Sequence, residues 1–453
     1  MLFNSMSFFI FFPVVVLLYY VIPDRMKKYW LLGAGLYFYT FLNPKNIIIL
    51  LFCITVTYVC ARQISGAGND TRRKLWLAAC SIVCLGVLFL GKYYNFAIGI
   101  SFYIFQAIGY TVDVYRREVP CEKNFFDHAL FVSFFPLILS GPIERSKNLL
   151  PQLKLPQHFD ERKVQSGLLL MMTGYFEKLV VAETAAIAVN YTFENFRRLD
   201  APILIFGMFA FSIQLYADFS GYSHIAIGAA KVLGIEIMQN FRQPYLATSI
   251  REFWHRWHIS LSGWFRDYLY IPLGGSKKGT LRKYVNLCTV FLVSGLWHGI
   301  SWHFVFWGLL NGAGQVLEDI LSRCHIKKLP QILAMIKTFV FWSFTLIFFR
   351  SPSLREGVEY LWYMFTRWST TGAGLSCEAF GFTVFEMLCF VAGIVILFVA
   401  DRLRESQRPP EELLLSVSVP ARWTFCLLFC LFIVLVAFRS FGQSASSFIY
   451  FQF

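Results

Sequence analysis

Charged residues are scarce in this sequence. Only 15% of its 453 residues are charged and 57% are hydrophobic, whereas a soluble domain carries about 25% charged residues. This shortage excludes a chain made of ordinary soluble domains. Several apolar stretches instead approach the roughly 20 residues that a helix needs to cross a bilayer. They include Ser7 to Ile22, Leu75 to Leu90, Phe380 to Ala400 and Trp423 to Phe438.

A cysteine pattern typical of a metal site is also missing. Of the eleven cysteines, Cys80 with Cys84 and Cys426 with Cys430 lie four apart within apolar stretches, where a thiol acts as a small buried hydrophobic group. No spacing is that of a zinc site. We therefore expect no metal and no resident cofactor, and the odd count argues against a fully disulfide-bonded framework.

The basic residues follow a membrane pattern. The net charge is +14, but Lys and Arg lie in short clusters between apolar stretches, which is typical of cytoplasmic loops rather than of a nucleic-acid-binding surface. Basic loops occur at Arg25 to Lys28, Arg62 to Lys74 and Arg116 to Lys123. Two apolar segments separate each loop from the next, Tyr29 to Leu42 with Ile47 to Ala61, and Leu75 to Leu90 with Phe96 to Val114. The pattern predicts an N-terminus outside and a first stretch that spans the membrane rather than a cleaved signal peptide.

Two later regions are less regular. Phe131 to Leu139 is too short to span and runs into Ser140-Gly-Pro-Ile143, which leaves a re-entrant segment or a surface loop; a re-entrant segment would point to an internal path. From Arg242 to Lys283, basic side chains alternate with Trp254, Trp257 and Trp264, which predicts a cytoplasmic block in the headgroup region. No internal repeat is evident. We predict one all-α polytopic membrane domain over residues 1–453, with roughly ten to twelve crossings.

His298 is the first candidate for chemistry, because an ionisable group within an apolar stretch is costly unless it is paired or functional. It lies between Gly295 and Gly299, and small residues allow another backbone or a substrate to approach closely. Imidazole can accept a hydroxyl proton at neutral pH, as a general base for acyl transfer requires. Taken alone, however, these residues favour a histidine packed and hydrogen-bonded between helices over a catalytic one.

Three further places carry ionisable residues. His255 and His258 are spaced to share a helix face, but without nearby carboxylates or thiolates a metal site is disfavoured. Asp218 precedes Phe-Ser-Gly-Tyr222, and its simplest role is to cap a helix from Gly221 to Leu233. Glu177 and Lys178 form the third place.

Six segments together resemble the membrane-bound O-acyltransferase (MBOAT) family, in particular its bacterial branch similar to the alginate O-acetyltransferase membrane subunit. The resemblance covers nearly the whole chain, and the order of the segments is specific. The segments are Ser140-Gly-Pro-Ile-Glu-Arg145, Asp218-Phe-Ser-Gly-Tyr-Ser223, Asn240-Phe-Arg-Gln-Pro-Tyr245, Glu252 to Ser262, Trp264 to Gly275 and Gly295-Leu-Trp-His-Gly299.

The resemblance implies a ring of helices and re-entrant segments around a central tunnel in the bacterial cytoplasmic membrane. His298 matches the catalytic histidine of the family, and His258, after Trp257, matches a second motif histidine that supports the site or the donor entrance. Two positions depart from the pattern. His224 stands where Asp is expected, and His255 stands where Arg or Asn is more usual.

The function implied is O-acyl transfer from a cytoplasmic thioester, such as acetyl-CoA, to hydroxyls of an extracytoplasmic polysaccharide, directly or through a secreted acetyltransferase partner. His298 would take the hydroxyl proton, and Trp297, Trp302 or His258 would stabilise the oxyanion. Asp218 and Trp257 are further candidates for binding substrate or donor. The donor's phosphates would meet Arg251, Arg256, Lys277 and Lys278.

Three other functions stay open. The same fold could transfer D-alanine to teichoic acid, although Ser294 to Gly308 and the ending Phe448 to Phe453 favour the polysaccharide-acetylating branch. A transporter of lipid-linked sugars, or a non-catalytic scaffold, would leave the Trp-His-Gly segment without a role, and paired discontinuous segments of a transporter are not evident.

The basic residues on either side of the segment that carries His298 bear on its depth in the membrane. Val285 to Leu310 is about one crossing long, yet Lys277 to Lys283 and Arg323 to Lys328 both read as cytoplasmic. Either the segment breaks near Gly295 and Gly299, which places His298 at a turn in mid-membrane, or one loop violates the charge rule.

Overall fold

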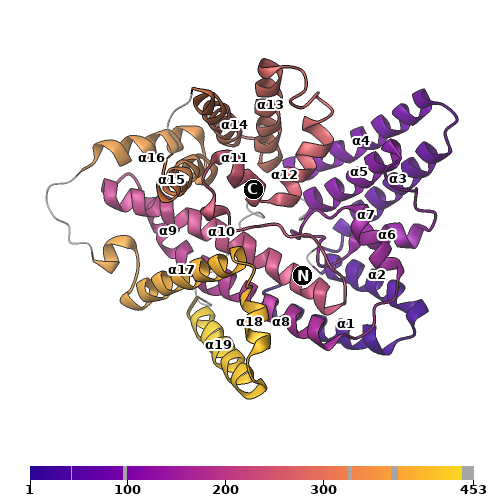
Figure 1. Ribbon diagram of the computed structural model, residues 1–453, viewed down its shortest axis with the longest axis horizontal. Helices are drawn as coiled ribbons and strands as arrows, with labels where there is room; N and C mark the ends of the chain where they lie inside the picture. The colour runs from indigo at the N-terminus through magenta and orange to yellow at the C-terminus, as the bar shows by residue number, and fades with distance from the viewer. Residues whose placement is uncertain (42, 95–98, 325–328, 369–375, 441–453) are drawn as a thin grey trace. The chain divides into compact units, whose positions relative to one another are not determined.

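The computed structural model describes residues 1–41, 43–94, 99–324, 329–368 and 376–440 (Figure 1). The described residues are helical apart from turns and loops and contain no strand, so the all-α prediction is confirmed. They fall into two compact units, which are described one at a time. The first holds residues 1–173 and 222–240, and the second holds residues 174–221 and 241–453. Predicted stretches that include residues 42, 96–98, 325–328 or 448–453 lie partly or wholly outside the described residues.

Helices of the first unit follow the predicted apolar stretches, because each stretch satisfies its backbone groups internally when it forms a helix in lipid. The stretches pack as neighbouring helices, with α3, α4 and α5 side by side (Figure 1). The elements are α1 (Met6–Val21), α2 (Asp24–Thr40), α3 (Asn46–Gly66), α4 (Asp70–Tyr93), α5 (Ile100–Arg116), α6 (Phe125–Ser133), α7 (Ser146–Lys154) and most of α8 (Glu161–Tyr175).

The segment after α6 is buried and irregular. Ser140 has no exposed surface, and Leu139 and Ile143 are almost fully buried, so the surface-loop alternative is wrong. The Glu144 carboxylate accepts hydrogen bonds from the backbone N–H groups of Arg145 at 2.8 Å and Met238 at 2.5 Å. The buried carboxylate thus fixes this non-helical backbone to a segment far away in sequence.

The second unit begins with a π-helical segment, η1 (Phe176–Ala182), and continues with helices that carry most of the candidate site. These are α9 (Glu183–Asn195), the first part of α10 (Ala201–Val232), α11 (Ile250–Arg256), α12 (Ile259–Phe265), α13 (Thr280–His298), α14 (Trp302–Arg323), α15 (Gln331–Arg350), α16 (Leu354–Thr366), α17 (Val384–Glu405), α18 (Pro410–Ser416) and α19 (Val419–Ser440). Short segments η2 (Pro244–Leu246), η3 (Arg266–Tyr270) and η4 (Cys377–Phe380) connect them.

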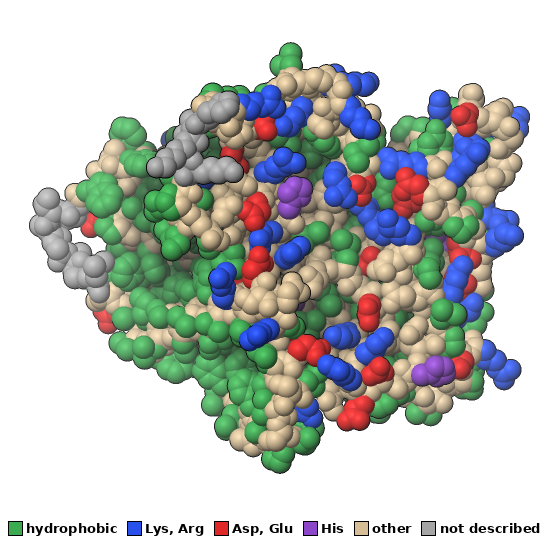
Figure 2. Space-filling view, in the orientation of Figure 1, with side chains coloured by type: hydrophobic (Ala, Val, Ile, Leu, Met, Phe, Trp, Pro, Cys, Tyr) green, Lys and Arg blue, Asp and Glu red, His purple; other side chains and the backbone are tan. Residues whose placement is uncertain are grey.

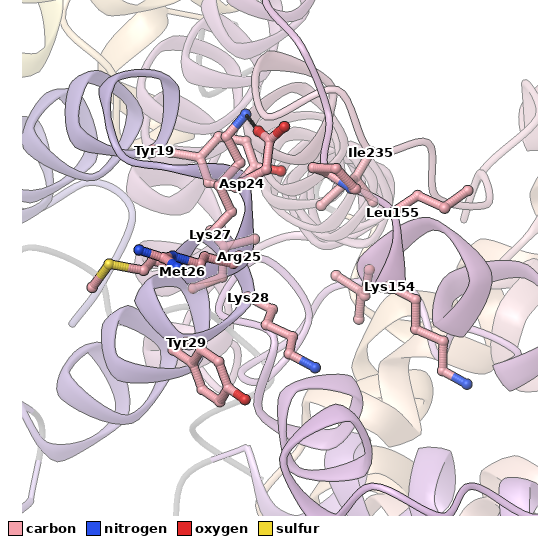
Figure 3. A pocket seen from close by; sticks show the side chains of 13 residues that line it. Tyr19, Asp24, Arg25, Met26, Lys27, Lys28, Tyr29, Lys154, Leu155 and Ile235 are labelled. Atoms are coloured by element: carbon pink, nitrogen blue, oxygen red, sulfur yellow. Dashed lines mark ion pairs between the residues drawn. The ribbon is translucent and has the colours of Figure 1, made fainter.

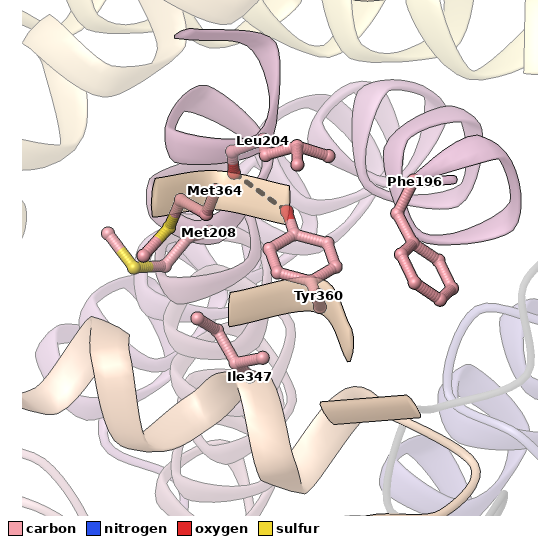
Figure 4. Close-up of a cluster of buried hydrophobic side chains, with 6 residues drawn as sticks. All are labelled: Phe196, Leu204, Met208, Ile347, Tyr360 and Met364. Carbon is pink, nitrogen blue, oxygen red and sulfur yellow. Dashed lines mark hydrogen bonds between the residues drawn. The ribbon is translucent and has the colours of Figure 1, made fainter. Parts of the chain in front are cut away.

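A hydrophobic cluster ties α9, α10, α15 and α16 of the second unit together (Figure 4). Tyr360 lies in it with 1% of its surface exposed, and its hydroxyl donates to the carbonyl oxygen of Leu204 at 2.7 Å. A buried phenol needs such an acceptor, because an unpaired hydroxyl in apolar surroundings is destabilising. The cluster consists of Phe196, Leu204, Met208, Ile347, Tyr360 and Met364.

The outer surface of the protein suits a lipid environment. Large hydrophobic side chains are exposed along several helices, as Figure 2 shows for one face. Within the described ranges, α3, α4, α10, α15, α17 and α19 are long and apolar enough to cross a membrane, and α1 is apolar but shorter. The protein is therefore a multi-pass membrane protein, and the total number of crossings stays a prediction.

Two tryptophans of the block from residue 242 to residue 283 are covered by protein. Trp257 and Trp264 are buried, as is the neighbouring Phe265. The expectation that these tryptophans face lipid headgroups is therefore wrong, and the position of the block at headgroup level stays a prediction. Alternation of aromatic and basic residues identifies an amphipathic element but does not decide whether lipid or protein covers its apolar side.

Candidate active site

His298 is the last residue of α13, and Trp302 is the first residue of α14. Gly299 between them is extended, and its N–H donates to the carbonyl oxygen of Gly295 at 3.2 Å, which closes the end of α13. The predicted break near Gly295 and Gly299 is confirmed. It places His298 at a tight turn between two packed helices (Figure 1).

Glycine allows these two helices to approach. A Cβ atom on Gly295 would collide with the carbonyl oxygen of Phe304, and one on Gly308 would collide with the carbonyl oxygen of Phe291. The backbones of α13 and α14 therefore touch, as small residues permit in membrane helix pairs. Close backbone packing fixes the position of the turn that carries His298.

Aromatic rings surround the His298 imidazole, which is 96% buried. The ring of Trp297 lies 4.7 Å away between centroids, and those of Trp307 and Phe349 each lie 5.1 Å away. Trp307 meets the imidazole edge-on, at 89° between the ring planes. Its own indole N–H is buried and has no acceptor among the described residues. A buried donor without an acceptor is rare in proteins and calls for an explanation.

His258 and His298 both contact the ring of Trp297. The indole ring of Trp297, next to His298 in sequence, lies 6.2 Å from the ring of His258. His258 is 1% exposed, contacts the ring of Phe219 at 4.6 Å, and has Ser260 Oγ 3.5 Å from its Nδ1. Burial lowers the pKa of His258, which keeps the imidazole neutral. The two motif histidines therefore belong to one aromatic site.

The backbone turns sharply at His258. Its φ and ψ are 44° and 53°, a left-handed conformation that costs a residue other than glycine free energy. Helix α11 ends before it and α12 begins after it. The prediction that His255 and His258 share a helix face is therefore wrong, because the helix is interrupted between them, and His255 is exposed.

Trp257 anchors this turn. Its ring is 2% exposed and packs on those of Trp342 at 4.9 Å, Phe241 at 5.0 Å and Phe253 at 5.5 Å. A buried indole contributes a large apolar surface. Packing of Trp257 thus holds the strained residue that follows it.

Arg256 is engaged inside the protein. Its guanidinium makes two hydrogen bonds to the Glu405 carboxylate, at 2.9 and 3.0 Å, and another to Glu252 at 3.0 Å. Burial alone would raise the pKa of Glu252, but hydrogen bonds from Thr248 and Arg256 outweigh it and lower that pKa. The paired guanidinium joins the start of the His258 turn to the end of α17.

Asp218 lies inside α10 and forms a buried ion pair. The Lys178 ammonium is 2.5 Å from Asp218 Oδ1, and the two side chains are 2% and 7% exposed. The prediction that Asp218 caps a helix from Gly221 to Leu233 is wrong, because α10 runs unbroken from Ala201 to Val232. Its carboxylate is tolerated there because the paired ammonium compensates for its desolvation.

Further buried charges adjoin this pair in sequence. Glu177 accepts a hydrogen bond from Ser220 Oγ at 2.7 Å and lies 3.6 Å from Arg404, which pairs with Glu411 at 2.6 Å. Tyr216 donates to Asp401 at 2.8 Å. Glu177 and Lys178 lie on η1, and π-helical segments are frequent at functional sites. The roles of Arg404 and Glu405 were missed from sequence, although two charges at the end of an apolar stretch were a signal.

The remaining predicted residues are exposed or belong to the first unit. Trp302 is 76% exposed. Arg251, Lys277 and Lys278 are exposed and hence accessible to a soluble anion. His224 belongs to the first unit. Among the residues that the structure describes, no group of three or more His, Cys, Asp or Glu side chains could hold a metal ion.

Comparison with known proteins gives a consistent result. The model of the membrane-bound O-acyltransferase family matches residues 75–355. The probable alginate O-acetylase AlgI of Pseudomonas putida is 33% identical, with all of both chains covered. The peptidoglycan O-acetyltransferase of Helicobacter pylori is 34% identical over 80% of this chain and 79% of its own.

A more distant relative is named for a different activity. The teichoic acid D-alanyltransferase of Streptococcus thermophilus is 29% identical over 50% of this chain and 57% of its own. The family match covers the segments that carry Asp218, His258 and His298. The chain therefore belongs to the membrane-bound O-acyltransferase family and is an O-acyltransferase of the bacterial cytoplasmic membrane.

Proposed function

We propose that this enzyme moves an acetyl group from a cytoplasmic thioester, with acetyl-CoA as the donor, to hydroxyl groups of an extracytoplasmic polysaccharide. Two relatives that the chain resembles over four fifths or more of its length are named for acetylation of alginate and of peptidoglycan. Those named for D-alanylation match about half of it. The longer and closer matches support acetyl over D-alanyl transfer.

One observation carries the proposal: a buried imidazole at a helix break, among aromatic rings and near a second buried histidine. The imidazole of His298 takes the proton of the acceptor hydroxyl while that oxygen forms a bond to the thioester carbonyl carbon. When the tetrahedral intermediate collapses, the carbon–sulfur bond breaks and the imidazolium returns the proton to the leaving sulfur. The products are an ester and a free thiol.

Charge develops on the carbonyl oxygen during this step, and a preorganised donor stabilises it. The Trp307 indole N–H fits this role because it is buried, adjoins the His298 ring and has no acceptor among the described residues. It adds to the donors expected from the sequence, Trp297, Trp302 and His258. Trp302 supports the role less well, because its side chain is mostly exposed.

The donor's phosphates would meet exposed cations. Arg251, Lys277 and Lys278 are exposed and are free to reorient toward an anion, as flexible cationic side chains do. Arg256 has a different role in this proposal, because Glu405 and Glu252 already bind its guanidinium. We assign Arg256 to positioning of the Trp257–His258 turn.

Two routes lead to the acceptor, one in a single step and one in two steps, and both need His298. In the two-step route, the first acceptor is a hydroxyl of a secreted acetyltransferase partner, which then acetylates the polysaccharide. The chemistry at the thioester is the same in both. A partner is therefore required for the final product only in the second route.

The test uses the full chain in sealed vesicles with its cytoplasmic face outward and acetyl-CoA labelled in the acetyl group. We expect His298→Gln to abolish transfer of label to polysaccharide or to added partner while the protein remains in the membrane. His303→Gln is the matched control, because His303 is also buried but bonds the carbonyl oxygen of Phe348 at 3.0 Å. Activity retained by His298→Gln would refute the catalytic role, and transfer from D-alanyl carrier protein instead of acetyl-CoA would refute the donor.

A further inference from the structure

A cavity of about 600 Å³ lies in the first unit, outside the candidate active site (Figure 3). It is formed where the start of α2, the end of α7 and the segment around residue 235 meet. Its volume is in the range of cavities that hold small molecules or headgroups. Its lining residues are Tyr19, Asp24, Arg25, Met26, Lys27, Lys28, Tyr29, Leu31, Leu153, Lys154, Leu155, Pro156 and Ile235.

Cations dominate the charged part of this lining. Arg25, Lys27, Lys28 and Lys154 line the cavity, and Asp24 is its one carboxylate. Three of the four belong to the loop that the sequence places on the cytoplasmic side. Basic pockets between membrane helices at this level are suited to lipid phosphates.

Carboxylates hold Lys27 and Lys28 in place but do not occupy all the N–H donors of the two ammonium groups. Lys27 Nζ pairs with Asp24 at 2.7 Å and donates to the carbonyl oxygen of Gln157 at 2.8 Å. Lys28 Nζ pairs with Asp127 at 2.8 Å, a hydrogen bond that raises the pKa of Lys28. Each ammonium has three N–H donors, so both lysines keep at least one for a ligand.

The other two cations are the more accessible ones. Lys154 pairs with Glu122 and keeps 45% of its side chain exposed. Arg25 is exposed and makes no ion pair with another residue that the structure describes. Three carboxylates offset the four cations: Asp24 in the lining, Asp127 beside Lys28 and Glu122 beside Lys154. The cavity and its ion-pair partners therefore carry a net charge of one positive unit. Arg25 and Lys154 are therefore the side chains that a bound anion would contact most easily.

The rim of the cavity is apolar and exposed. Met26 is 53% exposed, Tyr29 is 48% exposed and Leu155 is 65% exposed. Exposed tyrosines beside basic residues are typical of the membrane–water interface, where the ring sits at headgroup level. A soluble phosphate has no apolar part that could contact this rim, whereas the glycerol and upper acyl chains of a lipid would cover it.

We propose that this cavity binds the phosphate group of an anionic phospholipid from the cytoplasmic leaflet. Arg25 and Lys154 donate to the phosphate oxygens, Lys27 and Lys28 supply the fixed positive field, and Met26, Tyr29 and Leu155 cover the lipid's apolar part. Its lining includes neither His298 nor His258, and the proposal does not depend on the identity of the acyl donor. Acidic lipid thereby becomes a specific ligand of this enzyme.

The experiment uses the full chain in nanodiscs that contain phosphatidylcholine with a minor fraction of phosphatidylglycerol, and native mass spectrometry counts the phosphatidylglycerol that stays bound. The test variant is Arg25→Gln with Lys154→Gln. The matched control is Arg72→Gln with Lys74→Gln, which removes the same charge from another exposed basic loop predicted to be cytoplasmic. We expect retention to fall about five-fold for each cation removed at the cavity and to stay unchanged in the control.

Two further arms distinguish the sources of phosphate. Protein in phosphatidylcholine alone is exposed to inorganic phosphate or CoA, and then to vesicles with phosphatidylglycerol. Binding of phosphatidylglycerol alone, sensitive to the Arg25 and Lys154 changes, supports the proposal. Equal retention in test and control variants overturns it, and so does binding of free phosphate or CoA that phosphatidylglycerol does not displace. Arg25→Gln alone serves where the double variant fails to express, because Arg25 is exposed and its replacement breaks no ion pair among the described residues.

Discussion

Replacing Trp307 with Phe removes the indole N–H but keeps an aromatic ring beside His298. The Trp307 ring contacts the imidazole at 5.1 Å, and its N–H has no acceptor among the described residues. No hydrogen bond of the resting protein is lost, so we expect destabilisation of about 1–3 kcal/mol, from lost ring volume only. The catalytic effect is expected to be far larger than the fraction unfolded explains.

The size of that effect follows from the proposed role. Removing one donor to a developing oxyanion lowers kcat about 10²- to 10³-fold, or about 3–4 kcal/mol. KM should change little, because the donor acts mainly in the transition state. The Trp307 and His298 rings are perpendicular, so the substitution changes an edge-on contact of the imidazole and not a stacked one.

Trp342→Phe is the matched control. Trp342 is also 2% exposed and belongs to the same aromatic cluster, but it packs on Trp257 and Phe253 rather than on His298. The assay measures single-turnover transfer of labelled acetyl from the thioester, with thermal unfolding in detergent recorded for both variants. Equal rates in Trp307→Phe and Trp342→Phe would refute the oxyanion role of Trp307.

Two other predictions concern packing. Lys178→Met should destabilise the protein by about 3–5 kcal/mol, because it leaves the Asp218 carboxylate buried and uncompensated. Lys178→Met with Asp218→Asn should recover most of that loss in thermal unfolding. Equal losses of stability in the single and double variants would contradict the ion pair's role. Gly295→Ala should lower kcat, because its Cβ would collide with the backbone of Phe304 and displace the His298 turn. Gly86→Ala is the control and should leave kcat unchanged, because nothing lies within 4 Å of a Cβ at that position. Equal rates in the two variants would contradict the packing argument.

The helices were largely predictable from the sequence because lipid imposes a simple rule. Each apolar stretch must pair the hydrogen-bonding groups of its own backbone in lipid and therefore forms a helix. Hydropathy alone then locates α1, α4, α17 and α19. The break beside His298 was one of two alternatives that the sequence left open, because two basic flanks predicted on one side of the membrane are compatible either with a break or with a loop that violates the charge rule. What the rule does not supply is which segments lie against each other.

The errors come from contacts between residues far apart in sequence. Asp218 was predicted to cap a helix because its partner Lys178, on another element, is invisible in a local pattern. The shared face of His255 and His258 fails because packing of Trp257 holds the next residue in a left-handed conformation that no helical period anticipates. Trp307 and Glu405 were missed for the same reason.

The length of α10 bears on how the enzyme meets bilayers of different thickness. Its 32 residues extend about 48 Å, well beyond a hydrocarbon core of about 30 Å. A lipid-facing helix relieves such mismatch by tilting, but 78% of the apolar window of α10 is buried, against 11% for α19. Protein neighbours therefore limit how far α10 can tilt, and we expect a change of membrane thickness to act mainly on α19, whose apolar window is mostly exposed.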